Sequence, residues 1–464
     1  MSILEVVPPS APPLDPSFRP AALGTRAFLN EVRASGKAVP LAIGLERNPG
    51  SRSVFRTEVF GDRAHDEDNF RYIERTVKFL LWKEGGHRII IGGPSEIGNY
   101  IKAAYQPGGS RAFDAEFMAG VYEKPFVVEL MDAQFVPPAK MVSADVGRHL
   151  DGCRIGFDAG ASDRKVAAVV DGKAVYSEEV IWDPKGQKDP QYHYDQIMAS
   201  MKAAAEKMPR VDAIGVSSAG IYINNRVMVA SLFRGIPKDL FERRVKGLFL
   251  EIRKAWNNVP LEVVNDGEVT ALAGAMNLND GAVLGIAMGS SEAAGYVTPD
   301  GKLTDWLDEL AFAPVDFNPR APADEWSGDV GCGVQYFSQV GAIRLATAAK
   351  LAVTGNTPAE KLKSIQESLA KGDPKARGVF ESVGCYLGYS LAHYADFYKV
   401  KHALILGRVT SGEGGNIVRS KAEAILKNEF PELAGKLKLH LPEEEAERRV
   451  GQAIAAASLP QIKQ

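Results

Sequence analysis

Two segments of the chain decide its fold class: Ile155-Gly-Phe-Asp158-Ala-Gly160-Ala-Ser162-Asp-Arg-Lys165 and Val263-Val-Asn265-Asp266-Gly-Glu-Val-Thr-Ala-Leu-Ala-Gly274. Each begins with a short apolar run, typical of a buried strand, and has an aspartate where that strand ends. The small residues after Asp158 allow backbone amides to approach a bulky anion closely. An alanine-rich helix is expected directly after Asp266. The two segments therefore predict an α/β fold with strand-end carboxylates.

The two aspartates suit different parts of a phosphoryl transfer. A strand-end carboxylate beside a glycine turn, such as Asp158, can hold a hydrated magnesium ion near a phosphate. A second strand-end carboxylate, Asp266, can take a proton from a hydroxyl group. Together they predict phosphoryl transfer from a nucleotide to an alcohol. Purely structural roles stay open, because an aspartate at either position also caps a turn or a helix.

Length and composition exclude several classes of protein. A chain of 464 residues is too long for one ordinary core, so two or three domains are expected. The net charge of −3 argues against nucleic acid as a partner held by phosphate contacts. The three cysteines suggest a reducing compartment. Neither a signal peptide nor a membrane-length apolar run is recognised, so a cytoplasmic protein without a membrane partner is expected.

The pattern of strands and helices divides the chain into three parts. Residues 1–150 form an N-terminal α/β domain, residues 151–280 a second domain and residues 281–442 a third. The strands expected are 40–45, 53–60, 88–91, 153–158, 165–170, 174–180, 213–217, 261–264, 282–288, 296–298 and 403–406. The helices expected are 68–83, 192–207, 238–257, 334–353, 378–398, 416–427 and 443–457. The last helix is expected to pack back on the second domain.

The second domain has a recognisable order of elements. Three antiparallel strands are followed by a crossover helix and a parallel strand. The third part repeats this theme, with a hairpin that opens on the glycine turn Gly289–Gly295. The first domain contains a weaker internal similarity, because the pattern of residues 41–95 resembles that of residues 154–220. Since any α/β unit produces such a pattern, the similarity is more simply explained without a common origin.

From Cys153 to its end, about two thirds of its length, the chain resembles the ROK family of sugar kinases and repressors, within the actin/hexokinase-like superfamily. The resemblance lies in the order and spacing of Asp158-Ala-Gly160-Ala-Ser162, Ser217-Ser-Ala-Gly220, Asn265-Asp266, Gly289-Ser290-Ser291, Asp308-Glu309-Leu-Ala-Phe312, Gly331-Cys332-Gly-Val-Gln335, the glycines from Gly407 to Gly415, and the C-terminal pattern at Arg449. It implies two ribonuclease-H-like lobes with the active site in the cleft between them. ATP and Mg²⁺ are the cofactors that it implies, with a sugar as substrate. Residues 1–150 lie outside the resemblance and add a further α/β domain.

The resemblance also implies roles for individual residues. Asp266 is the general base, and Asn265 binds a sugar hydroxyl. Gly220, Glu309 and Gln335 lie at the sugar. The residues implied to bind nucleotide are Asp158, Gly160, Ala161, Ser162, Gly289, Ser290, Ser291, Gly407, Gly414 and Gly415, with Asp158 holding Mg²⁺ through water.

Four departures from the family pattern change these expectations. Phe312 stands where the family has a histidine, and Gln335 replaces an acidic sugar ligand. Of the four zinc ligands that many members have, only Cys332 remains, so no zinc site is expected. Ala293 and Ala294 replace glycines of the second phosphate loop, which weakens the expectation of close contact with ATP.

The sequence thus predicts ATP-dependent phosphorylation of a hydroxyl on a sugar or sugar-like polyol. The alternative is a catalytically weak sugar-binding or regulatory protein on a kinase scaffold. A DNA-binding repressor is less favoured, because residues 21–150 lack a helix-turn-helix pattern and are not notably basic. The turn at Asn48-Pro49 is a poor anion cradle, so the first domain is expected to serve structure or assembly. The sequence leaves a homodimer open.

Overall fold

The computed structural model describes residues 2–48, 50–141, 146–160, 163–441 and 445–462. Two compact units are present. Unit 1 contains residues 1–142, 286–294 and 305–441, and unit 2 contains residues 143–285, 295–304 and 442–464. The division into three domains at residues 150 and 280 stays a prediction.

Unit 2 contains a five-stranded sheet in the order β11-β8-β5-β6-β7. Its strands are β5 (Cys153–Ala159), β6 (Asp163–Val170), β7 (Lys173–Ile181), β8 (Ala213–Ser218) and β11 (Leu261–Asn265). β5, β6 and β7 pair antiparallel, whereas β8 pairs parallel with both β5 and β11. Helix α5 (Pro190–Ala205) connects the antiparallel strands to β8. This confirms the order predicted for the second domain.

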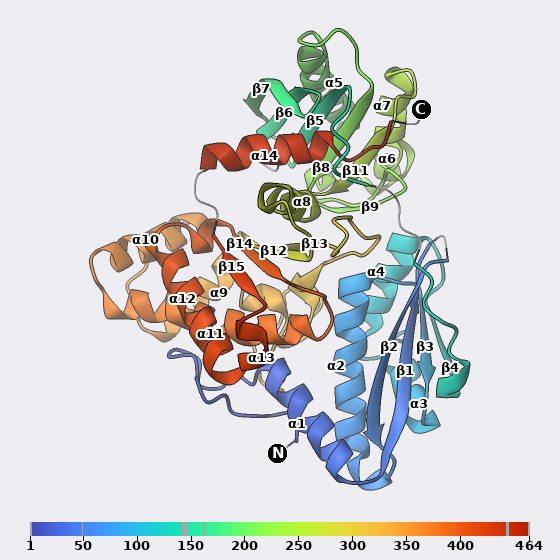
Figure 1. Ribbon diagram of the computed structural model, residues 1–464, viewed down its shortest axis with the longest axis vertical. Helices are drawn as coiled ribbons and strands as arrows, with labels where there is room; N and C mark the ends of the chain where they lie inside the picture. The colour runs from blue at the N-terminus through green and yellow to red at the C-terminus, as the bar shows by residue number, and fades with distance from the viewer. Residues whose placement is uncertain (1, 49, 142–145, 161–162, 442–444, 463–464) are drawn as a thin grey trace. The chain divides into compact units, whose positions relative to one another are not determined.

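Helix α14 (Glu445–Ala457) lies along one face of this sheet and contacts β5, β6 and β8 (Figure 1). Two glycines make the close approach possible. A Cβ atom at Gly156 would collide with the Ala453 carbonyl, and one at Gly215 would collide with the Ala456 carbonyl. The helix therefore packs its backbone directly on the sheet, over a small core that includes Ala167 and Val169.

The opposite face of the sheet carries the main core of unit 2, covered by α5 and by α7 (Leu248–Ala255). The single long helix predicted over 238–257 is wrong. The chain instead forms α6 (Lys238–Leu240), a π-helical turn (Phe241–Val245) and α7. Gly247 separates the turn from α7, and glycine is a weak helix former. The hairpin of β9 (Ile221–Ile223) and β10 (Arg226–Val229) was not predicted, although Asn224-Asn225 between them is a turn signal.

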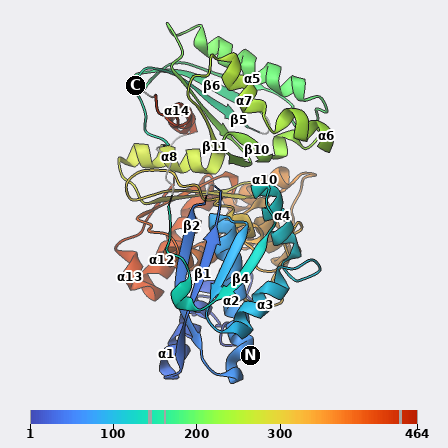
Figure 2. The ribbon, with the colours of Figure 1, turned by 90° about the vertical axis from the view of Figure 1, so that its right-hand side faces the viewer.

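The N-terminal part of unit 1 is a four-stranded sheet in the order β2-β1-β3-β4, with helices packed against it (Figure 2). Its strands are β1 (Ala38–Glu46), β2 (Arg52–Phe60), β3 (Arg88–Gly92) and β4 (Val127–Met131). Its helices are α1 (Ala21–Ala34), α2 (Asp66–Glu84), α3 (Ser95–Ala104) and α4 (Ala112–Tyr122). β1, β2, α2 and β3 confirm the predicted elements, whereas α1, α3, α4 and β4 were not predicted.

The internal similarity between residues 41–95 and residues 154–220 does not extend to the way their strands pair. β1 pairs antiparallel with β3, whereas the corresponding strands β5 and β8 pair parallel. Two sheets of different strand direction cannot be copies of one unit without rebuilding the connection between the strands. The internal similarity is therefore better explained as a pattern common to α/β units.

A second four-stranded sheet has the order β13-β12-β14-β15. Its strands are β12 (Val283–Met288), β13 (Glu292–Val297), β14 (His402–Leu406) and β15 (Lys438–His440). Around it lie α9 (Gln339–Ala348), α10 (Pro358–Ala370), α11 (Pro374–Ala395), α12 (Glu413–Glu429) and α13 (Pro431–Ala434). The second and third parts of the chain thus both contain a sheet that begins with a hairpin, as predicted.

Three boundaries in this region differ from the predictions. β13 begins at Glu292, not at Tyr296, so the turn before it is shorter than predicted. The helix predicted over 334–353 is only α9, because Ser338 caps it by accepting a hydrogen bond from the Gly341 amide. The glycine cluster predicted as a loop is mostly the first turn of α12, which begins at Glu413.

Candidate functional site

The candidate residues divide between the two units. Unit 2 holds Asp158, Gly160, Gly220, Asn265 and Asp266. Unit 1 holds Gly289, Ser290, Ser291, Glu309, Gln335, Gly407, Gly414 and Gly415. Ala161 and Ser162 of the first predicted phosphate loop lie outside the described residues, as does Pro49 of the N-terminal turn.

In unit 2, three parallel strands end at one edge of the sheet. Asp158 near the end of β5 pairs with Ser217 of β8, and Ser218 pairs with Asn265 at the end of β11. Because parallel strands place their carboxyl ends at the same edge, two segments separated in the sequence meet there. This is the geometry that the two quoted segments predict.

Asp266 lies at this edge as the first residue of α8 (Asp266–Leu278). Its side chain accepts a hydrogen bond from the Gly267 amide at 3.0 Å. Desolvation and the negative charge of Asp158 raise the pKa of Asp266 to about 6, although backbone amides oppose the increase. A carboxyl group with a pKa near 6 is largely ionised at neutral pH, yet is basic enough to accept a proton from a hydroxyl.

Asp158 is held by two side chains. Ser217 Oγ donates to Asp158 Oδ1 at 2.8 Å, and Lys165 Nζ lies 3.6 Å from Asp158 Oδ2. Desolvation raises the pKa of Asp158, and Lys165 and Ser217 lower it in part. The carboxylate keeps acceptor capacity for a water molecule, so a through-water contact to Mg²⁺ fits this position. Lys165, which sequence reasoning did not select, already supplies one positive charge.

Asn265 has a structural role that the sequence only partly predicts. Its Oδ1 accepts from the Gly267 amide at 2.8 Å and caps α8, while its Nδ2 donates to the Gly220 carbonyl at 2.8 Å. Gly220 has φ +133°, and a Cβ atom there would collide with the Val229 carbonyl. The pair therefore ties the loop after β8 to the start of α8. Contact of either residue with a sugar stays a prediction.

Tyr222 is a further polar residue of this edge that sequence reasoning missed. Its hydroxyl donates to Ser218 Oγ at 2.6 Å. Desolvation raises the pKa of Tyr222 well above its ordinary value, and the charge of Asp266 adds to the shift. A tyrosine four residues after a strand-end serine carries no recognisable motif, so only the fold reveals it.

In unit 1, the predicted second phosphate loop is a tight turn between β12 and β13. The Gly289 amide donates to the Ser291 carbonyl at 2.9 Å, and the Gly289 carbonyl accepts from the Gln339 amide at 2.8 Å. Ser290 and Ser291 are exposed. Since the Gly289 amide is used within the turn, any contact with phosphate depends on the amides of Ser290 and Ser291.

The glycines predicted to bind adenosine have structural reasons of their own. Gly407 has φ +97°, and a Cβ atom there would collide with the Met288 carbonyl. In α12, a Cβ at Gly414 would lie 2.6 Å from the Phe380 ring, and one at Gly415 would collide with the Thr410 carbonyl. Close packing therefore explains these three glycines, and nucleotide contact stays a prediction.

The predicted sugar residues of unit 1 lie in two short turns. Glu309 is half-buried at the start of the turn Leu310–Phe312, and its amide donates to the Trp82 carbonyl of α2 at 3.0 Å. Gln335 is buried at the end of the turn Gly333–Gln335. Phe312, where the resemblance implies a histidine, stacks on Trp82 with ring centroids 4.2 Å apart. An aromatic contact with the N-terminal part of unit 1 thus occupies this position.

Glu292 is an acidic residue of this region that sequence reasoning did not select. It is the first residue of β13 and is 3% exposed. Burial and the charge of Glu309 raise the pKa of Glu292 to about 8, and the Tyr394 hydroxyl opposes part of this shift. A buried glutamate directly after Gly289-Ser290-Ser291 breaks the apolar pattern of the strand, which is the signal that could have identified it.

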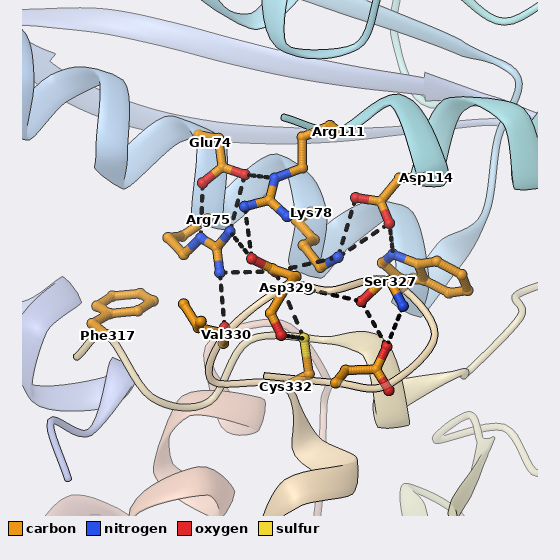
Figure 3. Close-up of polar contacts among 12 residues, drawn as sticks. Glu74, Arg75, Lys78, Arg111, Asp114, Phe317, Ser327, Asp329, Val330 and Cys332 are labelled. Atoms are coloured by element: carbon orange, nitrogen blue, oxygen red, sulfur yellow. Dashed lines mark hydrogen bonds and ion pairs between the residues drawn. The ribbon is translucent and has the colours of Figure 1, made fainter. Parts of the chain in front are cut away.

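Cys332 lies beside a buried cluster of charges that joins α2 and Arg111 to the loop 324–332 (Figure 3). Arg75 binds both carboxylate oxygens of Asp329 at 3.0 Å, and Lys78 Nζ and Arg111 Nη2 lie 3.3 and 2.8 Å from this group. Lys78 also binds Asp114 at 3.1 Å. Glu74 binds Arg75 and Arg111. We call the six charged residues Glu74, Arg75, Lys78, Arg111, Asp114 and Asp329 the α2 ion cluster.

Charges balance within the α2 ion cluster, which holds the loop that leads to Cys332. Burial would raise the pKa of Asp329, but Arg75, Lys78 and Arg111 hold it well below its ordinary value. Cys332 Sγ lies 3.6 Å from Asp329 Oδ2, and burial raises the pKa of its thiol to about 12. Among the described residues, no three His, Cys, Asp or Glu side chains are grouped to hold a metal ion. The absence of zinc stays a prediction.

Comparison with known structures shows which proteins share this fold. The ROK hexokinase from Thermus thermophilus matches with a TM-score of 0.51 and 18% identity, over 66% of this chain and 97% of that chain. A ROK family transcriptional regulator, a homolog of the E. coli MLC protein, matches with a TM-score of 0.51 and 18% identity, over 84% of this chain and 97% of its own. No family model and no curated protein sequence matches. These identities show the fold alone.

The chain therefore shares its fold with these ROK proteins, as its sequence predicts, and the α/β class is confirmed. The regulator match extends into the N-terminal part, since residues 151–464 are 314 of 464 residues, which is less than the 84% covered. None of the helices described here is both long and apolar enough to cross a membrane.

Proposed function

We propose that this protein phosphorylates a hydroxyl group of a sugar or sugar-like polyol with ATP, and that Asp266 is the general base. The observation that carries the proposal is the position of Asp266. It follows the end of β11, at the sheet edge where Asp158 also lies, and its pKa is raised to about 6. The fold shared with a ROK hexokinase supports it.

The proposed reaction is one phosphoryl transfer coupled to one proton transfer. The substrate oxygen forms a bond to the γ-phosphorus as the bond from that phosphorus to the ADP oxygen breaks. The Asp266 carboxylate accepts the hydroxyl proton. The negative charge of Asp158 makes the Asp266 carboxylate a stronger proton acceptor. Asn265 contributes by fixing the start of α8, and thereby the backbone of Asp266.

Mg²⁺ and ATP belong to the proposal. Asp158 would hold Mg²⁺ through water, in the orientation that Ser217 fixes. When bound, the ion neutralises charge on the phosphate oxygens. Backbone amides at Gly160, Ser290 and Ser291 would contact phosphates, and the start of α12 would contact adenosine. Glu309, Gln335 and Gly220 would contact the sugar.

A regulatory or catalytically weak sugar-binding protein is the second candidate. Two observations favour it. The Gly289 amide is used within its own turn, and the Lys165 ammonium already lies beside Asp158, where an ion would compete with it. In this case the protein binds a sugar without transferring phosphate. A cytoplasmic location fits both candidates and is proposed for either.

Thermal-shift measurements with ATP-Mg²⁺ and a panel of sugars, followed by ADP release for each sugar that stabilises the protein, separate the two candidates. A kinase shows stabilisation by a sugar and sugar-dependent ADP release that Asp266→Asn reduces by about 10²-fold or more. Stabilisation by a sugar without ADP release supports the second candidate and contradicts the first.

A further inference from the structure

The end of helix α2 is capped by the segment that carries Glu309. The last four carbonyl groups of an α-helix have no partner within the helix. Here the Lys83 carbonyl accepts a hydrogen bond from the Asp308 amide at 2.8 Å, and the Trp82 carbonyl accepts one from the Glu309 amide at 3.0 Å. The backbone of Glu309 is therefore placed by the end of this helix.

Asp308 turns the chain at this point. Its φ is +49°, in the left-handed region, where most residues with a side chain are strained and aspartate and asparagine are better tolerated. Its carbonyl accepts a hydrogen bond from the Leu310 amide at 2.9 Å. The direction in which the chain leaves α2, and with it the position of Glu309, thus depends on the backbone conformation of Asp308.

The side chain of Asp308 is held by a residue 90 positions away. The Tyr398 hydroxyl, beyond the end of α11, donates to Asp308 Oδ1 at 2.7 Å. Asp308 is 1% exposed, and burial raises the pKa of its carboxyl group to about 7. A glycine would adopt the same backbone conformation with neither strain nor a buried acid. What the aspartate adds over a glycine is the hydrogen bond from Tyr398.

Both neighbours of Asp308 are themselves held by Lys83 of α2. The Lys83 ammonium lies 3.6 Å from the centroid of the Trp306 ring and 4.7 Å from that of the Tyr398 ring. The two rings contact each other edge to face, with centroids 6.0 Å apart. Cation–π contacts of this kind strengthen where water is excluded, and Lys83 and Tyr398 are both buried. The hydrogen bond to Asp308 therefore comes from a fixed donor.

We propose that Asp308 is a positioning residue for sugar binding, which fixes Glu309 through its left-handed backbone and the hydrogen bond from Tyr398. The proposal rests on the proposed function, because the contact between Glu309 and the sugar belongs to it. A misplaced sugar ligand weakens binding of the ground state and the transition state alike. Loss of Asp308 should therefore raise KM for the sugar and leave kcat nearly unchanged.

The test measures ADP release by the full chain against the concentration of glucose, mannose, fructose and ribose, and the Kd of each sugar by calorimetric titration. Asp308→Ala loses the acceptor and is strained at positive φ, so KM and Kd should rise about tenfold or more. Asp308→Asn still accepts from Tyr398 and tolerates this backbone, so both constants should stay within about threefold of wild type. A purely structural role would lower the thermal midpoint of Asp308→Ala without changing the KM of the folded protein.

A second variant tests the hydrogen bond from its other end. Tyr398→Phe keeps the ring over Lys83 and removes the donor, so it should raise KM by itself, including where Asp308→Ala does not fold. In the double variant Asp308→Ala/Tyr398→Phe the two effects on KM should not add, because both remove one interaction. Effects that add in full would show that Tyr398 does not act through Asp308.

Asp171→Ala is the matched control. Asp171 also has a left-handed backbone, with φ +46°, and its Oδ1 accepts a hydrogen bond from the Gly152 amide at 2.9 Å, but it lies in an exposed turn of unit 2. The substitution removes the same kind of side chain from the same backbone conformation. KM and kcat should both stay at their wild-type values.

The outcomes separate this proposal from the kinase assignment. ADP release with an unchanged KM in Asp308→Ala overturns the positioning role and leaves the kinase intact. An Asp308→Asn variant as impaired as Asp308→Ala also overturns it. Sugar binding that weakens in Asp308→Ala and recovers in Asp308→Asn, without ADP release by the wild type, supports the positioning role and contradicts the kinase. If none of the four sugars binds to the wild type, the proposal is overturned together with the sugar site on which it rests.

Discussion

At the residue scale, the candidate base owes its properties to its neighbours. Asp266 begins a helix, where the helix dipole and the Gly267 amide favour the charged form. Desolvation and the negative charge of the nearby Asp158 favour the protonated form more strongly, so the pKa of Asp266 is raised to about 6. Without the charge of Asp158, Asp266 would be a weaker base, although desolvation, the larger cause, would still raise its pKa.

Asp266→Asn should reduce phosphoryl transfer by about 10²–10⁴-fold or more, because an amide cannot accept the hydroxyl proton. Sugar binding should remain, since Asn265 still caps α8. The measurement is ADP release under saturating sugar and ATP. Asp195→Asn, an exposed change on α5, serves as the control with wild-type turnover. Turnover of Asp266→Asn near that of this control would contradict the assignment.

The pH dependence of kcat/KM should report the same residue. Below a pKa of about 6, Asp266 becomes protonated and can no longer act as a base, so the rate should fall about tenfold for each further pH unit. Because the pKa is raised in the folded state, stability should change in the opposite sense and increase as pH falls from about 6 toward 4. A rate that stays constant down to about pH 4.5 would exclude Asp266 as the base.

At the scale of single elements, helix α2 shows why an amphipathic pattern is not always a surface pattern. Every residue from Tyr72 to Glu84 is buried. Its charged residues Glu74, Arg75 and Lys78 face the loop 324–332 through the α2 ion cluster. Spacing of three and four residues places them on one side of the helix, which a sequence pattern would assign to solvent. Partners about 250 positions away make this side an interior one.

Asp329→Asn should therefore destabilise unit 1 by about 3–5 kcal/mol, because it leaves buried arginines and a lysine short of one negative charge. Urea unfolding measures the change. The control is Glu381→Gln, which breaks the exposed pair with Arg377 and should cost less than about 1 kcal/mol. Equal effects of the two variants would show that the α2 ion cluster does not hold the loop.

At the scale of the whole molecule, the N-terminal part is built into unit 1. Residues 1–142 share one compact unit with residues 305–441. Trp82 stacks on Phe312 and the α2 ion cluster holds Asp329, so α2 supports both turns that carry predicted sugar residues. We infer that this part is a structural support, as the poor anion cradle at Asn48-Pro49 suggested.

Deletion of residues 1–142 should abolish the cooperative unfolding transition of unit 1 and expose apolar surface, while unit 2 keeps a transition of its own. Differential scanning calorimetry of the truncated and full chains makes the comparison. Isolated residues 21–150 should bind no ATP in a calorimetric titration. A truncated chain with unchanged transitions, or ATP binding by the isolated segment, would contradict a structural role.

Much of the fold of unit 2 could be predicted from the sequence, because its determinants are local. Apolar runs of strand length, glycine turns and the Asn265-Asp266 helix start each act over a few residues, and parallel pairing then brings Asp158 and Asp266 to one edge. Three regions were predicted wrongly although their signals are also local. Gly247 and the capping residue Ser338 make two helices shorter than hydrophobic periodicity predicts, and Asn224-Asn225 form a hairpin turn where no strands were predicted.

The sequence by itself therefore determined the strand order around Asp158 and Asp266 and the chemistry that two strand-end carboxylates offer. Only the tertiary structure decided what surrounds them. Whether an acid is buried, paired or alone depends on side chains from remote segments, and burial and charge then set its pKa. For this reason Lys165 beside Asp158 and the three cations around Asp329 emerged only from the folded chain. The burial of the Glu292 carboxyl did so as well.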